Sequence, residues 1–234
     1  MKKIFKLLCP PIFLKIYYKY INNIENKKDV FNKNHADDSK QDLEIYWSEN
    51  MANILENWGR NNTWTDIECL LINCKGKVLD IACGSGVNIK EISRFPFLDL
   101  HGFDISDLLI KKAIERGVDS SKLRVTDATK TSYFENEFDY SYSIGSLEHF
   151  TEEGISLFLK EAARYTSKKS FHMIPVSENN LDNGWIEKDF QSYYNNSINW
   201  WLPKFQKEYR EVYVIPSTWF DKGTSIGKWF VCCH

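Results

Sequence analysis

An acidic residue and two glycines stand where a strand is expected to turn into a helix. Residues 78–88 are Val-Leu-Asp-Ile-Ala-Cys-Gly-Ser-Gly-Val-Asn, an apolar strand followed by a Gly-x-Gly turn. Gly84 and Gly86 permit a tight turn, and because they lack a Cβ a ligand can approach the backbone beside the free N–H groups of the helix. Asp80 would lie beside that ligand. Some ordinary strand-to-helix turns share this pattern, but it is typical of nucleotide and cofactor sites.

Two further acids follow two further expected strands. Asp104 ends the apolar segment 98–104 and stands 24 residues after Asp80, near the offset of about 20 residues at which an acid binds ribose hydroxyls. Asp127 follows the expected strand 123–126. A carboxylate at that edge can accept a hydrogen bond from an adenine amino group. The three acids together therefore favour a nucleoside ligand.

The turn argues against a dinucleotide. A third glycine would let helix and strand pack closely under a pyrophosphate, but Val87-Asn88-Ile89 follows Gly86. Three carboxylates at three strand ends suit a cationic nucleoside without phosphates. S-adenosylmethionine has these properties, since it carries a sulfonium, an amino acid, a ribose and an adenine.

At this point the chain resembles the class I S-adenosylmethionine-dependent methyltransferases. The resemblance covers roughly residues 45–234 and is carried by residues 79–86, Asp104, Asp127 and residues 138–150. It implies a Rossmann-like, doubly wound α/β fold with a mostly parallel seven-stranded sheet and an antiparallel C-terminal hairpin. It also implies a methyltransferase that uses S-adenosylmethionine as its cofactor.

The resemblance assigns parts of the cofactor to the strand ends. The methionine end would lie beside Asp80 and the glycine turn, the ribose beside Asp104, the adenine beside Asp127, and the transferred methyl beside residues 144–149. The implied cofactor-binding residues are Asp80, Ala82, Cys83, Gly84, Gly86, Asp104, Ile105, Asp127, Ala128, Ile144 and Gly145. Ala82 departs from the pattern, because many members have glycine there, and we expect it to change only the fine position of the cofactor.

His149 and Glu148 are the candidate catalytic residues. His149, with an ordinary pKa near 6.5, can take a proton from an attacking hydroxyl, a step that general bases favour by about 10²–10⁴-fold. Alternatively, His149 caps the next helix or makes a hydrogen bond to the backbone. Glu148 orients the imidazole, binds the cofactor or is structural. The segment lacks an Asn-Pro-Pro-Tyr-like turn and a cysteine nucleophile, which disfavours nucleobase methylation.

Residues 176–197 are expected to supply the acceptor site as a long loop at the carboxyl edge of the sheet, where ligands bind. Aromatic faces and carboxamides suit sugar rings, and the candidates are Trp185, Tyr193, Asn195 and Asn196. Trp200, Trp201 and His172 are interpreted as core residues instead.

The elements that must hold these residues alternate regularly. Helical spacing covers 46–64 and 67–72, and the resemblance implies that these helices cap the cofactor. The remaining expected helices are 86–94, 106–116, 152–165 and 197–208, and the expected strands after the first are 99–103, 122–126, 139–144, 170–175, 210–215 and 226–233. Alternation of strands and helices predicts a doubly wound parallel sheet, and the last two strands predict a hairpin at one edge.

Composition agrees with one globular enzyme domain. The 234 residues include 43% apolar and 15% aromatic residues, and a net charge of −2 gives no pull toward nucleic acid. The six cysteines form no Cys-x-x-Cys pair and the five histidines show no zinc spacing. We therefore expect no metal and a reducing, cytoplasmic setting.

Residues 1–21 differ from the rest, with five lysines and no acid. Pro10-Pro11 and Lys15 interrupt the apolar run, which argues against a signal peptide or a membrane span. Two interpretations stay open: a basic amphipathic segment that contacts the inner membrane face or a partner, or a helix folded back on the domain. Residues 22–42 are expected to be a polar linker, and residues 43–234 the methyltransferase domain.

These features predict an O-methyltransferase that acts by direct transfer on a small polar acceptor. Lys-Leu-Leu-Cys-Pro-Pro-Ile near the start and Gly-Lys-Trp-Phe-Val near the end are similar to methyltransferases of bacterial surface-glycan pathways. This likeness implies a sugar, or a sugar-borne phosphate-type group, of a capsule or lipooligosaccharide precursor. The alternatives are a lipid-soluble quinone or other small metabolite, a nicotinamide-dependent reductase suggested by Tyr165-x-x-x-Lys169, and a non-catalytic cofactor-binding module.

Overall fold

The computed structural model describes residues 44–60, 62–188 and 191–234. The expected amphipathic segment 1–21 and linker 22–42 lie outside the described residues. Of the described residues, 44–60, 62–186 and 192–234 form one compact unit, which contains the main sheet. No helix of the described part is long and apolar enough to cross a membrane.

The main sheet has seven strands in the order β3-β2-β1-β4-β5-β9-β8. They are β1 (Gly76–Ile81), β2 (Leu98–Asp104), β3 (Leu123–Val125), β4 (Phe138–Ile144), β5 (Thr166–Ser177), β8 (Glu211–Asp221) and β9 (Ser225–Cys233). The first five are parallel, and β9 runs antiparallel between β5 and β8. The predicted doubly wound sheet with a C-terminal hairpin is confirmed.

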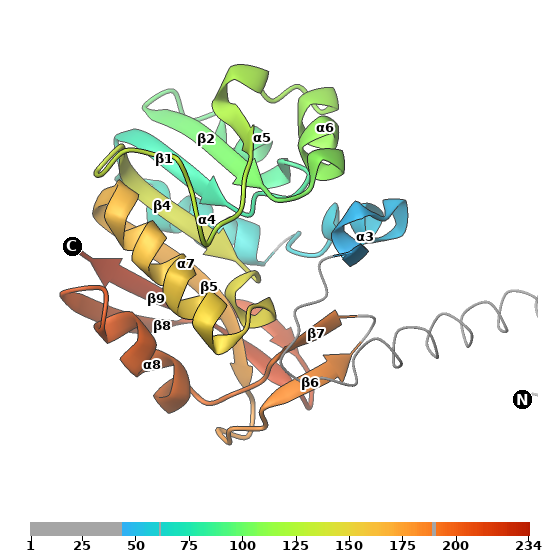
Figure 1. The fold of residues 1–234 in the computed structure, drawn as a ribbon, viewed down its shortest axis with the longest axis vertical. Coiled ribbons are helices and arrows are strands. Elements are labelled where there is room, and N and C mark those ends of the chain that lie inside the picture. Colours follow the sequence, from blue (N-terminus) through green and yellow to red (C-terminus); the bar gives the residue numbers. More distant parts are fainter. Residues whose placement is uncertain (1–43, 61, 189–190) are drawn as a thin grey trace, which may run out of the picture. The chain divides into compact units, whose positions relative to one another are not determined.

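Helices cover both faces of this sheet, so the core has two apolar layers. On one face lie α7 (Glu152–Tyr165) and α8 (Ile198–Gln206) (Figure 1), whose buried side chains join one cluster. A second cluster holds the side chains of α4 (Thr63–Leu71), α5 (Val87–Ile92) and α6 (Asp107–Glu115). Because each helix is apolar along one stripe, burial of that stripe fixes the strand ends.

The N-terminal segment is more broken than the spacing predicted. Instead of one helix over 46–64, the chain forms a short 3₁₀ turn η1 (Glu44–Trp47), α3 (Glu49–Leu55) and then α4. Ser48 caps α3 by accepting a hydrogen bond from Met51 N, and Asn62 caps α4 by accepting from Thr63 N. Two caps within so short a stretch start two helices.

A carboxylate on α4 fastens this helix to the far edge of the sheet. Asp66 accepts hydrogen bonds from Ser217 Oγ at 2.6 Å, from Thr218 N and Oγ1 at 3.0 Å, and from Trp229 Nε1 at 3.1 Å. The register of β8 shifts between Pro216 and Phe220, so the carboxylate supplies partners at an irregular part of the strand.

The loop expected over 176–197 contains a two-stranded sheet, β6 (Trp185–Lys188) with β7 (Gln191–Tyr194). Within the core, Trp201 is fully buried and His172 binds Ser143 Oγ at 2.8 Å and Tyr209 OH at 3.2 Å. Both were expected there. Burial lowers the pKa of His172 to about 3, and its neighbour His234 adds to this, so it stays neutral.

Candidate functional site

The turn between β1 and α5 has left-handed backbone at three residues. These are Ala82, Gly84 and Gly86, with φ of 56°, 54° and 69°. A Cβ on Gly84 would meet only Leu55 Cδ1, at 3.9 Å, whereas on Gly86 it would lie 2.7 Å from Ala113 Cβ. Gly84 thus leaves its α-carbon open to a ligand, while Gly86 lets α5 pack on α6.

Asp104 ties the end of β2 to this turn. Its Oδ2 accepts from Gly84 N and its Oδ1 from Ser106 N, both at 2.9 Å. The side chain is buried, and burial raises its pKa to about 6 in spite of these bonds. At neutral pH it is therefore mostly ionised, and a carboxylate oxygen can accept further hydrogen bonds beyond the ones from the backbone.

Asp80 lies deeper, at the end of β1. Its side chain is buried, and its Oδ2 accepts a hydrogen bond from Tyr142 OH at 2.9 Å. Burial raises the pKa of this carboxyl well above its ordinary value. The buried Cys83 follows in the same turn, and its N–H donates to Phe103 O at 2.8 Å.

A cavity of about 240 Å³ opens beside the turn. Four residues expected at a cofactor line it together, namely Ala82, Ile105, Asp127 and Ala128. Asp127 accepts from Thr129 N and Thr129 Oγ1, each at 2.8 Å. The rest of the lining is Phe103, Thr126, Thr129, Phe150, Thr151, Glu153, Gly154 and Leu157.

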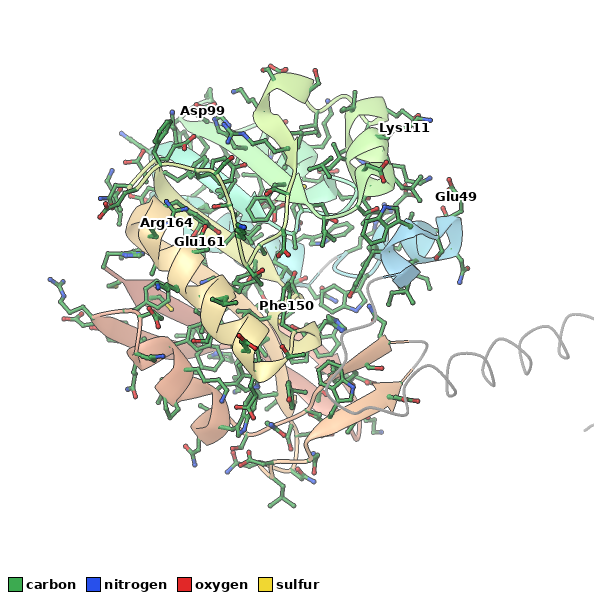
Figure 2. All side chains as sticks on the ribbon, in the orientation of Figure 1. Glu49, Asp99, Lys111, Phe150, Glu161 and Arg164 are labelled. Carbon is green, nitrogen blue, oxygen red and sulfur yellow. The ribbon has the colours of Figure 1, made fainter. Side chains whose placement is uncertain are left out.

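Phe150 and Leu157 are lining residues that the sequence did not single out. Phe150, labelled in Figure 2, packs on Gly154 in the first turn of α7. Its position next to His149 was the one available clue. The wall that α7 provides depends on how this helix lies on the sheet, and no local spacing encodes that.

The segment after β4 carries the two candidate catalytic groups. His149 Nδ1 lies 2.8 Å from Ser192 O, and because a carbonyl only accepts, Nδ1 must carry the hydrogen. The other ring nitrogen, Nε2, is then an acceptor, 3.8 Å from Glu148 Oε1. The backbone bond considered for His149 therefore exists, and it leaves the second nitrogen basic.

Burial sets the protonation of this pair. It lowers the pKa of His149 to about 4, which corrects the expected value near 6.5, and it raises that of Glu148 to about 8. Both groups are thus neutral at pH 7. Glu148 Oε2 is buried and has no hydrogen-bond partner among the described residues.

Aromatic rings surround the pair. Tyr46 and Tyr193 meet the ring of His149 edge-on, with centroids 6.4 and 5.9 Å away. Trp58 lies against Gly145, where an added Cβ would also be 3.4 Å from Glu148 Oε1. The side chains come from η1, β7 and the stretch before α4, so segments distant in the sequence form one wall.

The carboxamides of two predicted acceptor residues already make hydrogen bonds within the protein. Asn195 Nδ2 donates to Thr224 O and its Oδ1 accepts from Ser225 Oγ, both at 3.2 Å. Asn196 Oδ1 accepts from Gly184 N at 2.7 Å. Trp185 packs on Tyr194, whereas Tyr193 lies beside His149. The predicted acceptor contacts of these residues stay predictions, and Tyr193 is the best placed of them.

The structure does not bring together the two residues on which the nicotinamide-dependent reductase interpretation rests. Tyr165 is fully buried in an apolar cluster at the end of α7, so its hydroxyl cannot serve a hydride transfer together with the exposed Lys169.

The residues at the turn fit S-adenosylmethionine. Gly84 leaves an open face, and Ser85 Oγ and Asn88 Oδ1 are buried polar atoms without a partner in the described part of the chain. A ligand with polar groups of its own would satisfy these atoms. No group of three or more His, Cys, Asp or Glu in the described ranges is arranged to hold a metal ion.

Residues 78–169 match the family model for a methyltransferase domain. This part of the chain is therefore similar to a methyltransferase domain, in line with the resemblance drawn from the sequence. A curated relative is phosphoethanolamine N-methyltransferase 1 of Triticum aestivum, which is 30% identical over 98 residues. That match covers 41% of this chain and spans about a fifth, 20%, of the relative's length.

Solved structures share the methyltransferase fold at low identity. A putative methyltransferase of Haloferax volcanii, solved in complex with the Trm112 activator, is 13% identical with a TM-score of 0.63, over 83% of this chain and 98% of that one. The [4+2]-cyclase SpnF is 18% identical with a TM-score of 0.53, over 64% and 57%. Since a cyclase shares the fold, the reaction must be argued from the site.

Proposed function

We propose that this methyltransferase moves a methyl group from S-adenosylmethionine to a hydroxyl of a small polar acceptor. The observation that carries the proposal is the tautomer of His149. Its Nδ1 hydrogen is bound by Ser192 O at 2.8 Å, so Nε2 has a free lone pair, and burial keeps the ring neutral. A neutral, oriented imidazole is the base that a hydroxyl acceptor needs.

The cofactor would lie along the carboxyl ends of β1, β2, β3 and β4. In this proposal the adenine fills the cavity lined by Ala82, Ile105, Asp127 and Ala128. Asp104 accepts from the ribose. The methionine end lies over Gly84, and the other residues that would contact it are Asp80, Cys83, Gly86, Ile144 and Gly145.

When bound, S-adenosylmethionine supplies an electrophilic methyl group on a sulfonium. The acceptor oxygen would attack this carbon while the carbon–sulfur bond breaks, and His149 Nε2 would take the hydroxyl proton. A charged imidazolium is costly in a buried site. The carboxyl group of Glu148, whose Oε1 is 3.8 Å from Nε2, would then release its own proton to solvent more readily, and the resulting carboxylate would balance the charge of the imidazolium.

The acceptor class we favour is a sugar, or a sugar-borne phosphate-type group, of a bacterial capsule or surface-glycan precursor. The rings of Tyr46, Trp58 and Tyr193 near the pair support it, because sugar C–H faces pack on aromatic rings. Labelled S-adenosylmethionine with a panel of nucleotide-activated sugars tests it. Label should enter a sugar product with the native chain and much less with His149→Ala. Transfer only to a quinone or another small metabolite would favour that alternative.

An amine acceptor is the second candidate. Glu148 Oε2 is buried without a partner in the described residues, and an ammonium or amine N–H would satisfy it. The curated relative is named for an N-methylation. The same assay with small amines, phosphoethanolamine among them, separates the two. Absence of transfer to any acceptor, with the cofactor still bound, would favour a non-catalytic module.

We also propose that the basic residues 1–21 contact an anionic membrane surface at the cytoplasmic side. The support is compositional, five lysines and no acid among apolar residues. The full chain should sediment with vesicles containing phosphatidylglycerol, and less so at high salt. A variant with these lysines changed to glutamine that sediments equally well would refute the contact.

A further inference from the structure

Asp80 is a buried carboxyl group beside which the described part of the chain places no cation. The groups that face it are Tyr142 from β4, Asp104 from β2 and Cys83 from the turn. All of them are neutral or acidic. Within the described residues, no lysine, arginine or histidine pairs with Asp80, which is unusual for a carboxylate that is only 2% exposed.

Tyr142 is the fixed partner of Asp80. The two residues stand opposite one another in the parallel pairing of β1 and β4, and the phenol is fully buried. Its hydroxyl donates to Asp80 Oδ2 at 2.9 Å. Since a donated hydrogen bond stabilises a carboxylate more than a carboxylic acid, Tyr142 favours the ionised form, while burial and the nearby Asp104 favour the neutral one.

Burial, and the absence of a paired cation among the described residues, favour the neutral form of Asp80 in the free protein. Burial raises the pKa of Asp80 well above its ordinary value, with Tyr142 opposing the rise and Asp104 adding to it. Burial likewise holds the pKa values of Cys83 and Tyr142 well above theirs. At pH 7.5 Asp104, with a pKa of about 6, has already ionised.

We propose that Asp80 is a neutral carboxylic acid held by Tyr142 in the free protein, and that binding of the ammonium group at the amino acid end of the donor releases the Asp80 proton to solvent. The Asp80 carboxyl loses one proton to the buffer, and the resulting carboxylate faces the ligand ammonium and keeps the Tyr142 bond. Tyr142 acts here as a positioning residue. The inference rests on the proposed cofactor and not on the acceptor.

This exchange makes affinity depend on pH. At pH values below the pKa of Asp80, the dissociation constant of S-adenosylmethionine should fall about tenfold for each unit by which the pH rises, because one proton leaves for each ligand bound. Above that pKa it should level off.

Calorimetry of the full chain at pH 7.5, in buffers with different ionisation enthalpies, counts the protons. About one proton should leave when S-adenosylmethionine binds, and the same for S-adenosylhomocysteine, which keeps the ammonium. 5′-Methylthioadenosine has no amino acid end and should release none. Release with this ligand too would overturn the inference.

Variants assign the proton. Asp80→Asn should abolish release, whereas Glu148→Gln, which removes another buried carboxyl group with a raised pKa, should retain it. Tyr142→Phe should weaken binding roughly tenfold at pH 7.5 and move the pH dependence upward. Tyr140→Phe, two residues earlier on β4 and half-buried, is the matched control and should change neither.

The outcomes separate the two proposals. If S-adenosylmethionine does not bind at all, the proposed cofactor fails and this inference with it. Binding without proton release overturns the inference alone, as does release that survives in Asp80→Asn. Where Asp80→Asn does not bind, an unchanged pH dependence in Tyr142→Phe gives the same negative answer.

Discussion

The indole of Trp58 lies directly on the backbone of Gly145. A Cβ added to Gly145 would stand 2.8 Å from Trp58 Cη2 and 3.4 Å from Glu148 Oε1. Trp58 itself packs on Trp219, with ring centroids 5.4 Å apart. Trp58, which lies between α3 and α4, therefore touches the segment that carries the candidate catalytic pair. The contact requires glycine at position 145, because a Cβ there would collide with the indole.

Gly145→Ala should destabilise the protein more than an ordinary glycine replacement. The left-handed φ of 62° costs an alanine about 1–2 kcal/mol, and crowding against Trp58 adds about 1–3 kcal/mol. Urea unfolding measures the sum. Gly184→Ala is the control, since its φ of 76° has nothing within 4 Å of a new Cβ. Equal losses in both variants would mean that Trp58 moves away at no cost.

His149→Ala should lower kcat by about 10²-fold or more and leave S-adenosylmethionine affinity unchanged. Because burial lowers the pKa of His149 to about 4, its contribution should be flat between pH 6 and 7.5 and fall only in more acidic buffer. Steady-state rates over pH, with a binding titration, check both parts. His101→Ala, on β2, serves as the control. A wild-type inflection at pH 6–7 that disappears in His149→Ala would contradict the neutral, buried imidazole.

Glu148→Gln should stabilise the free protein increasingly as the pH rises. The folded pKa of about 8 lies above the ordinary 4.5, so this group favours folding below pH 4.5, and its contribution is lost as pH rises through 8. Glutamine does not titrate. The difference in unfolding free energy between variant and wild type should therefore grow by on the order of 2–4 kcal/mol between pH 5 and 8.

Thermal melts over that range, converted to free energies, test the Glu148 prediction. Glu153→Gln, an exposed carboxylate on α7, should show no such trend. If the difference in unfolding free energy between Glu148→Gln and wild type stays constant from pH 5 to 8, the Glu148 carboxyl group is hydrated and its pKa is not raised.

Asp104→Asn should weaken S-adenosylmethionine binding about 10–100-fold, because hydrogen bonds to a charged acceptor contribute about 1.5–3 kcal/mol. It should also lower the melting temperature, since Asp104 accepts from Gly84 N and Ser106 N. Calorimetry and melting measure the two effects. Asp99→Asn alters a half-exposed partner of Lys122 on the same strand and should leave binding unchanged. Unchanged S-adenosylmethionine affinity in Asp104→Asn would show that the ribose does not bind at Asp104.

The order of elements was predictable because it is written in local periodicity. The helix expected over 152–165 has those bounds in the structure, where Thr151 Oγ1 accepts from Gly154 N at its start. Asp80, Asp104 and Asp127 also lie at or just after the carboxyl ends of strands, as the alternation of strands and helices predicted. Parallel strands end at one edge, so this placement needs no knowledge of packing.

What the sequence did not reveal depends on contacts between distant residues. The break between α3 and α4, the strands β6 and β7 and the wall made by Trp58 have no periodic pattern of their own. Asn195 and Asn196 suit a sugar by residue type, yet their amides bind Thr224 O, Ser225 Oγ and Gly184 N. The low pKa of His149 follows from burial, which only the assembled fold creates.

The position of β9 between β5 and β8 has a consequence for how the chain is made. During synthesis β8 leaves the ribosome before the strand it pairs with, and the edge of β5 stays open until residues 225–233 emerge. The hydrogen bonds of Asp66 also form late in synthesis, since its partners Ser217, Thr218 and Trp229 lie near the C-terminus. An open edge invites pairing with other chains. A nascent chain stalled before β9 should therefore need chaperone protection, although most of its sheet can already form.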